Sequence, residues 1–281
     1  MSRHLTQRLA FGLLILATLA TTVPIVLIVG YIAAAGLPAI SLEFLTAMPR
    51  DGMRAGGIWP AIVGTLLLTA GTAVVAVPLG IAAAIYLAEY AKDTPLTRAI
   101  RIAIINLAGI PSVVYGLFGL GLFVLFLGFG TSILAGSLTL AIMTLPVIIS
   151  TTEEALRAVP QAFRVVSISL GGTKWQTIRR IVLPQALPGI LTGVILGLER
   201  AAGETAPILF TAAAFFLPRL PNSPLDATMA LPYHLFVIAT QVPGMPVQIQ
   251  YGTALVLLVF VLSMNFFATI IRSRARARRQ W

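Results

Sequence analysis

Long runs without Asp, Glu, Lys or Arg dominate the pattern of this chain. They cover residues 9–42, 55–88, 102–152, 181–198 and 227–271. A helix that crosses a membrane needs about 20 apolar residues, so the run 102–152 has room for two crossings. Gly128 and Gly130 mark the turn between them. The pattern predicts six spanning helices, at 9–35, 59–88, 101–127, 133–157, 186–212 and 249–271.

The basic residues between these runs predict the orientation of the chain. With the N-terminus inside, 15 of the 19 basic residues lie on inner segments. Only Arg50, Arg54 and Arg219 lie on outer loops, and Arg200 lies within a span. Because inner loops of membrane proteins are rich in Lys and Arg, both termini are expected on the cytoplasmic side. The first run is longer than the apolar core of a cleaved signal peptide, so we expect a retained anchor.

Composition excludes several classes of protein. Apolar residues make up 58% of the 281 residues and charged residues 10%, with a mean hydropathy of +0.96. Such a chain cannot supply the polar surface of a soluble domain, a coiled coil or a disordered segment. Cysteine is absent and there are two histidines, so we expect no disulfide and no metal site. The net charge of +10 sits in short clusters beside the spans, which favours a topology signal over nucleic-acid binding.

An unusual inner loop, residues 153–184, separates the fourth and fifth spans. Phe163, Val166, Ser167 and Leu170 have helical spacing, and the pair Gly171-Gly172 is expected to end that short helix. A second amphipathic stretch follows. Two interpretations stay open from composition alone, namely a helix resting on lipid headgroups and a helix that docks into the groove of a partner.

The second half of this loop resembles the inner loop of importer-type ABC permeases, E-A-A-x3-G-x9-I-x-L-P. Gly171 is followed, after nine residues, by Ile181-Val182-Leu183-Pro184. The first half departs from that pattern, because Val165, Val166 and Ser167 stand at the E-A-A positions. The resemblance implies a coupling helix that fits a cleft of an ATPase subunit. The coupling residues it implies are Phe163, Val165, Val166, Ser167, Leu170, Gly171 and Gly172.

Other segments narrow the resemblance. They are Gly56 to Thr65, Pro111 to Gly119, Arg200 to Pro207 and Met229 to Leu235. Together they look like the A-type permease subunit of the bacterial high-affinity phosphate importer, the Pst system. This implies an all-α integral membrane protein, a six-span type I (MetI-like) importer bundle in the inner membrane. The implied divisions are an anchor and outer loop at 1–55, a permease domain at 56–272 and a basic cytoplasmic tail at 273–281.

The resemblance also implies the partners. They are a homologous C-type permease, two ATPase subunits, an extracytoplasmic phosphate-binding protein docking on outer loops 36–58 and 213–248, and membrane lipid. A P-loop needs G-x-x-x-x-G-K-[ST], and Gly171-Gly172-Thr173-Lys174 does not fit it. We therefore expect no catalytic residue and no cofactor in this chain, with ATP-Mg held by the partner ATPase.

The fifth predicted span contains three charged residues, Glu199, Arg200 and Glu204. At 100° per residue, Arg200 and Glu204 share a face with the small residues Gly189, Gly193, Gly197 and Ala201, so they should point into the bundle and pair. An arginine in the membrane can hold phosphate oxygens. We predict a translocation pathway formed by Arg200, Glu204, Glu199 and Thr205, with Pro207 breaking the helix. A structural ion pair is the alternative.

Three other functions stay open at this point. The first is a permease for another oxyanion, such as molybdate, sulfate or phosphonate. The second is an ion-driven secondary carrier, although such carriers commonly show inverted repeats, and none is evident here. The third is a membrane subunit that senses phosphate supply without transporting it.

Overall fold

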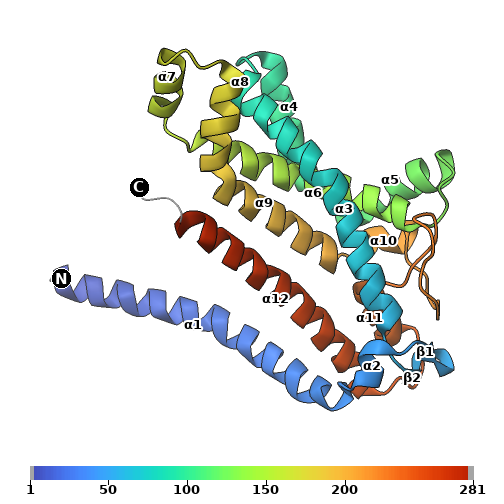
Figure 1. Ribbon diagram of the computed structural model, residues 1–281. Coiled ribbons are helices and arrows are strands. Elements are labelled where there is room, and N and C mark those ends of the chain that lie inside the picture. Colours follow the sequence, from blue (N-terminus) through green and yellow to red (C-terminus); the bar gives the residue numbers. More distant parts are fainter. Residues whose placement is uncertain (1–2, 278–281) are drawn as a thin grey trace.

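The computed structural model describes residues 3–277 of the chain, and helices build most of it (Figure 1). Within that range, five helices are long and apolar enough to cross a membrane. Their cores are α1 (Arg3–Gly36), α3 (Trp59–Ile85), α6 (Ile133–Arg157), α9 (Leu183–Gly203) and α12 (Val247–Ala277). A π-helical turn, η3 (Tyr86–Tyr90), extends α3. The helix α8 (Lys174–Thr177) and the π-turn η5 (Ile178–Val182) lead without a break into α9.

The third predicted span, 101–127, is not one continuous helix. The segment divides into α4 (Pro95–Ala108) and α5 (Ser112–Gly119), and α5 continues as the π-turn η4 (Leu120–Phe126). The two parts are bent by 102°, and the count of candidate spans reaches six if this pair is one crossing. Pro111 explains the bend, because proline removes a backbone donor and disfavours helix at the residue before it. The Leu107 carbonyl accepts from the Tyr115 hydroxyl at 2.7 Å, in addition to Ile110 N at 3.1 Å, and the hydroxyl ties the two parts together across the bend.

The fifth predicted span, 186–212, is also interrupted. The helix α9 ends at Gly203, Glu204 has extended backbone, and the short helix α10 (Ala206–Thr211) follows. We expected Pro207 to cause the break. Instead Pro207 lies in the first turn of α10, where its missing N–H costs no helical hydrogen bond. The interruption therefore falls at Glu204 and Thr205.

Small residues let α6 and α9 approach closely. A Cβ atom placed on Gly193 would lie 1.8 Å from Thr151 Oγ1, and one on Gly189 would lie 2.5 Å from Ala155 Cβ. Close approach of this kind is how helices associate in lipid, where burial of apolar area gives no driving force. The predicted small-residue face of the fifth span is thus the contact with α6. The helix α1 lies apart from this centre and contacts α12, with the Tyr31 ring edge-on to Tyr251 at 5.3 Å (Figure 1).

Short elements cover the end of the bundle that is predicted to be the outer one. They are the 3-10 turns η1 (Leu37–Ala39) and η2 (Asp51–Met53), the helix α2 (Leu42–Thr46), the antiparallel strands β1 (Pro49–Arg50) and β2 (Ala55–Gly56), and the helix α11 (Leu231–Thr240). The loop between α10 and α11 is fastened to the start of α6. Its residues Pro224 and Asp226 accept hydrogen bonds from Leu134 N and Ile133 N, each at 2.9 Å.

The predicted basic tail, 273–281, is described only in part. Residues 273–277 continue α12, while Arg278 and Arg279 lie outside the described residues. The start of α1 and the end of α12 lie on the same side of the molecule as α7 (Gln161–Ser169), as six crossings would place them (Figure 1).

Candidate functional site

The predicted inner loop, residues 153–184, contains two short helices, α7 and α8, joined by a turn. The helix α7 begins after Pro160 and ends at Ser169, two residues before the left-handed Gly171, whose φ is +84°. Gly172 N then donates to Ser167 O at 3.0 Å, closing the end of the helix. The prediction that Gly171-Gly172 ends this helix is confirmed. A capping box between Thr173 and Gln176 starts α8 immediately afterwards.

One face of α7 is apolar and exposed. The exposed fractions are 60% for Val165, 58% for Val166 and 84% for Leu170. Neighbouring apolar side chains left open on so short a helix are typical of an interaction site. The other predicted coupling residues differ. Phe163 is half-buried against the apolar cluster at the inner ends of α3 and α9, and the Ser167 hydroxyl lies 2.8 Å from the Thr177 hydroxyl of α8.

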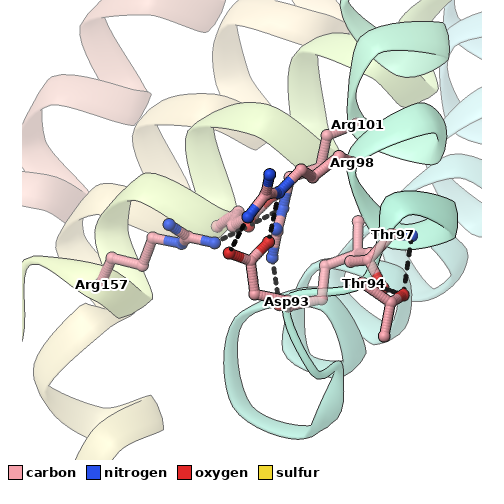
Figure 2. A network of polar contacts seen from close by, with 8 residues as sticks. Asp93, Thr94, Thr97, Arg98, Arg101 and Arg157 are labelled. Atoms are coloured by element: carbon pink, nitrogen blue, oxygen red, sulfur yellow. Dashed lines mark hydrogen bonds and ion pairs between the residues drawn. The ribbon is translucent and has the colours of Figure 1, made fainter.

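Ion pairs that sequence reasoning missed hold the helices together at the end of the bundle that contains α7. Glu153 of α6 pairs with Arg101 of α4 at 2.9 Å and with Arg157 at 2.7 Å. At the tip of the α3–α4 connection, Arg98 binds both oxygens of Asp93, and these hydrogen bonds hold the pKa of Asp93 below its ordinary value (Figure 2). The residues of the α4–α6 pair are 52 positions apart, so no local sequence pattern could have revealed it.

The most enclosed of these pairs joins α7 to η3. Arg164 Nη2 lies 2.7 Å from Glu89 Oε1, and the two side chains are only 13% and 8% exposed. The same guanidinium donates to the carbonyl of Val159, two residues past the end of α6, at 2.6 Å and to that of Leu156, in the last turn of α6, at 2.8 Å. Here too the partners are far apart in the chain, separated by 75 positions.

The charged residues of α9 fall into two groups. Arg200 Nε lies 3.3 Å from Glu204 Oε1, which confirms the predicted pairing. The Arg200 side chain remains 35% exposed, while Glu204 is 17% exposed and lines a small internal cavity. Thr205 follows directly, half-buried at the interruption between α9 and α10.

Glu199 points elsewhere. Its Oε2 accepts a hydrogen bond from Asn265 Nδ2 of α12 at 3.4 Å. Its Oε1 is buried and has no hydrogen-bond partner within the described residues. A cavity of about 50 Å³, which Arg272 also lines, lies beside it. The structure therefore brings Arg200, Glu204 and Thr205 together and separates Glu199 from them.

Comparison with known proteins identifies the class of protein. Residues 76–277 match the family described as binding-protein-dependent transport system inner membrane component. The chain is 35% identical to the phosphate transport system permease protein PstA of Mycobacterium leprae, over 98% of this chain and 91% of that protein. It is 32% identical to the probable ABC transporter permease protein YqgI of Bacillus subtilis, over 99% of this chain and all of that protein.

Solved structures support the same fold. A bacterial ABC transporter that imports the polysaccharide alginate superimposes with a TM-score of 0.67 at 17% identity, over 97% of this chain and 99% of that one. The MetNI methionine ABC transporter in an inward-facing conformation gives a TM-score of 0.62 at 18% identity, over 78% of this chain and 97% of that one. The predicted all-α, MetI-like permease class is thereby confirmed. The chain belongs to the binding-protein-dependent inner membrane components, the non-enzymatic permease subunits of ABC importers.

Proposed function

We propose that this chain is the permease subunit of an importer that moves inorganic phosphate across the bacterial cytoplasmic membrane, driven by ATP. The observation that carries the proposal is its similarity to proteins named as phosphate transport permeases. The match to the M. leprae protein extends over nearly the whole chain. A PstA 1 protein of Mycobacterium tuberculosis is 38% identical over 80% of this chain.

The family works with other permease, ATPase and substrate-binding partners. For this chain we propose a homologous C-type permease, two ATPase subunits and an extracytoplasmic phosphate-binding protein. The exposed apolar face of α7 supports docking of an ATPase there, and ATP-Mg would be held by that partner with no cofactor in this chain. Both termini would be cytoplasmic, and the binding protein would dock on outer loops 36–58 and 213–248.

For the translocation pathway, the geometry favours Arg200, Glu204 and Thr205 over Glu199, whose carboxylate lies between α9 and α12. The guanidinium of Arg200 hydrogen-bonds only to Glu204 among the described residues and is one-third exposed, so most of its five donors are free to meet phosphate oxygens. Glu204 competes for the same guanidinium and would favour release of the anion. The interruption at Thr205 adds backbone groups that an unbroken helix would not offer.

The test is uptake of radiolabelled phosphate into vesicles that hold the whole complex, with binding protein outside and ATP inside. We expect accumulation that requires ATP, that persists when ionophores collapse ion gradients, and that excess sulfate or molybdate does not inhibit. Accumulation without ATP would indicate a secondary carrier. Inhibition by another oxyanion would indicate that this oxyanion, and not phosphate alone, is a substrate of the transporter. ATP turnover without accumulation would favour a sensor.

A further inference from the structure

We propose that Arg164 and Glu89 form the joint that passes movement of α7 to α3 and α6. This inference rests on the proposed function, because it concerns how an ATPase docked on α7 would drive the bundle. Both are positioning residues: neither is exposed enough to be part of the docking face itself, and both lie remote from Arg200.

The contacts of Arg164 support this assignment. Its Nε and Nη2 reach Glu89 Oε1 at 3.2 and 2.7 Å, and Nε also reaches Oε2 at 3.4 Å. It also donates to the carbonyl of Leu156, in the last turn of α6, and to that of Val159, just past this helix. One side chain thus joins three elements, α7, η3 and α6. Because a guanidinium is planar and its donors are fixed relative to one another, α7 cannot shift without moving its partners or breaking several bonds together.

Little else fixes the position of α7. Within this fully described helix no residue is buried. A cavity of about 590 Å³ lies between α7 and the bundle, lined by Arg164 together with Val165, Ile168 and Lys174. Apart from the half-buried Phe163 and the bond between Ser167 and Thr177, the ion pair is the main tie between α7 and the helices that cross the membrane.

The segment that receives Arg164 is itself distinctive. The turn η3 is π-helical, a form that is rare and often found at functional sites. Basic side chains from three other helices contact the residues of η3. Arg164 of α7 binds Glu89, Arg101 of α4 donates to Leu87 O at 2.8 Å, and Lys174 Nζ of α8 lies 4.7 Å from the centre of the Tyr90 ring. Displacement of α7 and α8 would therefore act on the inner end of α3 at one place.

The experiment uses the whole complex in vesicles, with Glu89→Gln, Arg164→Met and the double variant. The readouts are co-purification of the ATPase subunits, stimulation of ATP hydrolysis by the binding protein, and ATP consumed per phosphate accumulated. We expect normal assembly, with the ATP consumed per phosphate rising about tenfold. Arg98→Met is the matched control, because the Arg98–Asp93 pair also lies at the inner end but is about two-thirds exposed on both sides. This control should keep the wild-type ratio.

The double variant serves to distinguish loss of coupling from misfolding. Each single variant leaves a buried charge without its partner, whereas the double variant leaves none. Uncoupled hydrolysis in an assembled double variant would support the joint. A wild-type ratio in that variant would overturn it, as would a loss of transport that follows loss of assembly in all three. Absence of ATP-driven phosphate uptake in the wild-type complex would instead refute the proposed function.

Discussion

Two arginines of this chain illustrate how the surroundings of one residue type determine its use. Arg164 is nearly enclosed and its donors end on Glu89 and two carbonyls, so it holds a fixed position. Arg200 is one-third exposed and hydrogen-bonds only to Glu204 among the described residues. A guanidinium whose donors are already satisfied gains little from a further anion, whereas one with unused donors can still bind one. At the scale of the residue, Arg164 is suited to structure and Arg200 to a ligand.

Replacement of Arg200 should therefore affect transport much more than folding. A partly exposed ion pair contributes about 0–1 kcal/mol to stability, so Arg200→Ala should assemble and unfold at nearly the wild-type temperature. Phosphate uptake should fall by about tenfold or more, because a charge-assisted hydrogen bond is lost from the proposed pathway. Arg98→Ala, which removes an exposed ion pair elsewhere, is the control. Normal uptake by Arg200→Ala would show that Arg200 is structural.

At the scale of the element, the close contact between α6 and α9 depends on glycine residues, which have no side chain. Gly193 lies against Thr151, while Gly203 of the same helix has open space where a Cβ would stand. Gly193→Ala should force the two helices apart, and overpacking of this kind costs about 1–3 kcal/mol. Thermal unfolding of the purified complex should show a lower midpoint for Gly193→Ala and none of this loss for Gly203→Ala. Equal midpoints for the two variants would contradict the close packing described here.

The same scale shows how far sequence patterns reach. Runs of apolar residues predicted the helices that contain 9–35, 59–88, 133–157 and 249–271, because length and hydropathy suffice for an unbroken crossing. The break at Gly109–Pro111 was not predicted, since hydropathy averaged over a window does not register backbone turns. A break in the fifth span was predicted at Pro207, but it falls at Glu204 and Thr205. Local chemistry predicted the end of α7 before Gly171 and the Arg200–Glu204 pair. The ion pair between Arg164 and Glu89 could not be predicted from the sequence, because it forms only when segments distant in the chain pack together.

At the scale of the whole molecule, the distribution of exposed apolar residues agrees with a lipid environment. The most apolar stretch of α1 has none of its residues buried. Leu13, Leu16 and Leu27 are each more than 60% exposed. Because so much exposed apolar surface would cause a soluble protein to aggregate, α1 must be covered by lipid or by another membrane subunit.

The orientation of the chain can be tested directly, because it has no cysteine. Single cysteines at Asp51, in the outer hairpin, and at Ser169, at the end of α7, provide the two probes. With both termini inside, an impermeant maleimide added to intact cells should label Asp51→Cys at once and Ser169→Cys only after the membrane is opened. The unsubstituted chain is the control for background labelling. The reverse pattern would invert the proposed topology.

The loop between α10 and α11 is bound to the start of α6 through its main chain. Carbonyls of Pro224 and Asp226 accept from the first N–H groups of that helix, and within the loop Ala214 N donates to Thr228 O. A main-chain carbonyl is supplied by every amino acid, but its position depends on how many residues precede it. The Asp226 carboxylate also accepts from Asn222 N and Ser223 N within the loop, but the bonds to α6 themselves require no particular side chain. In evolution or in engineering, insertion or deletion of a single residue should therefore displace these carbonyls and expose the end of α6.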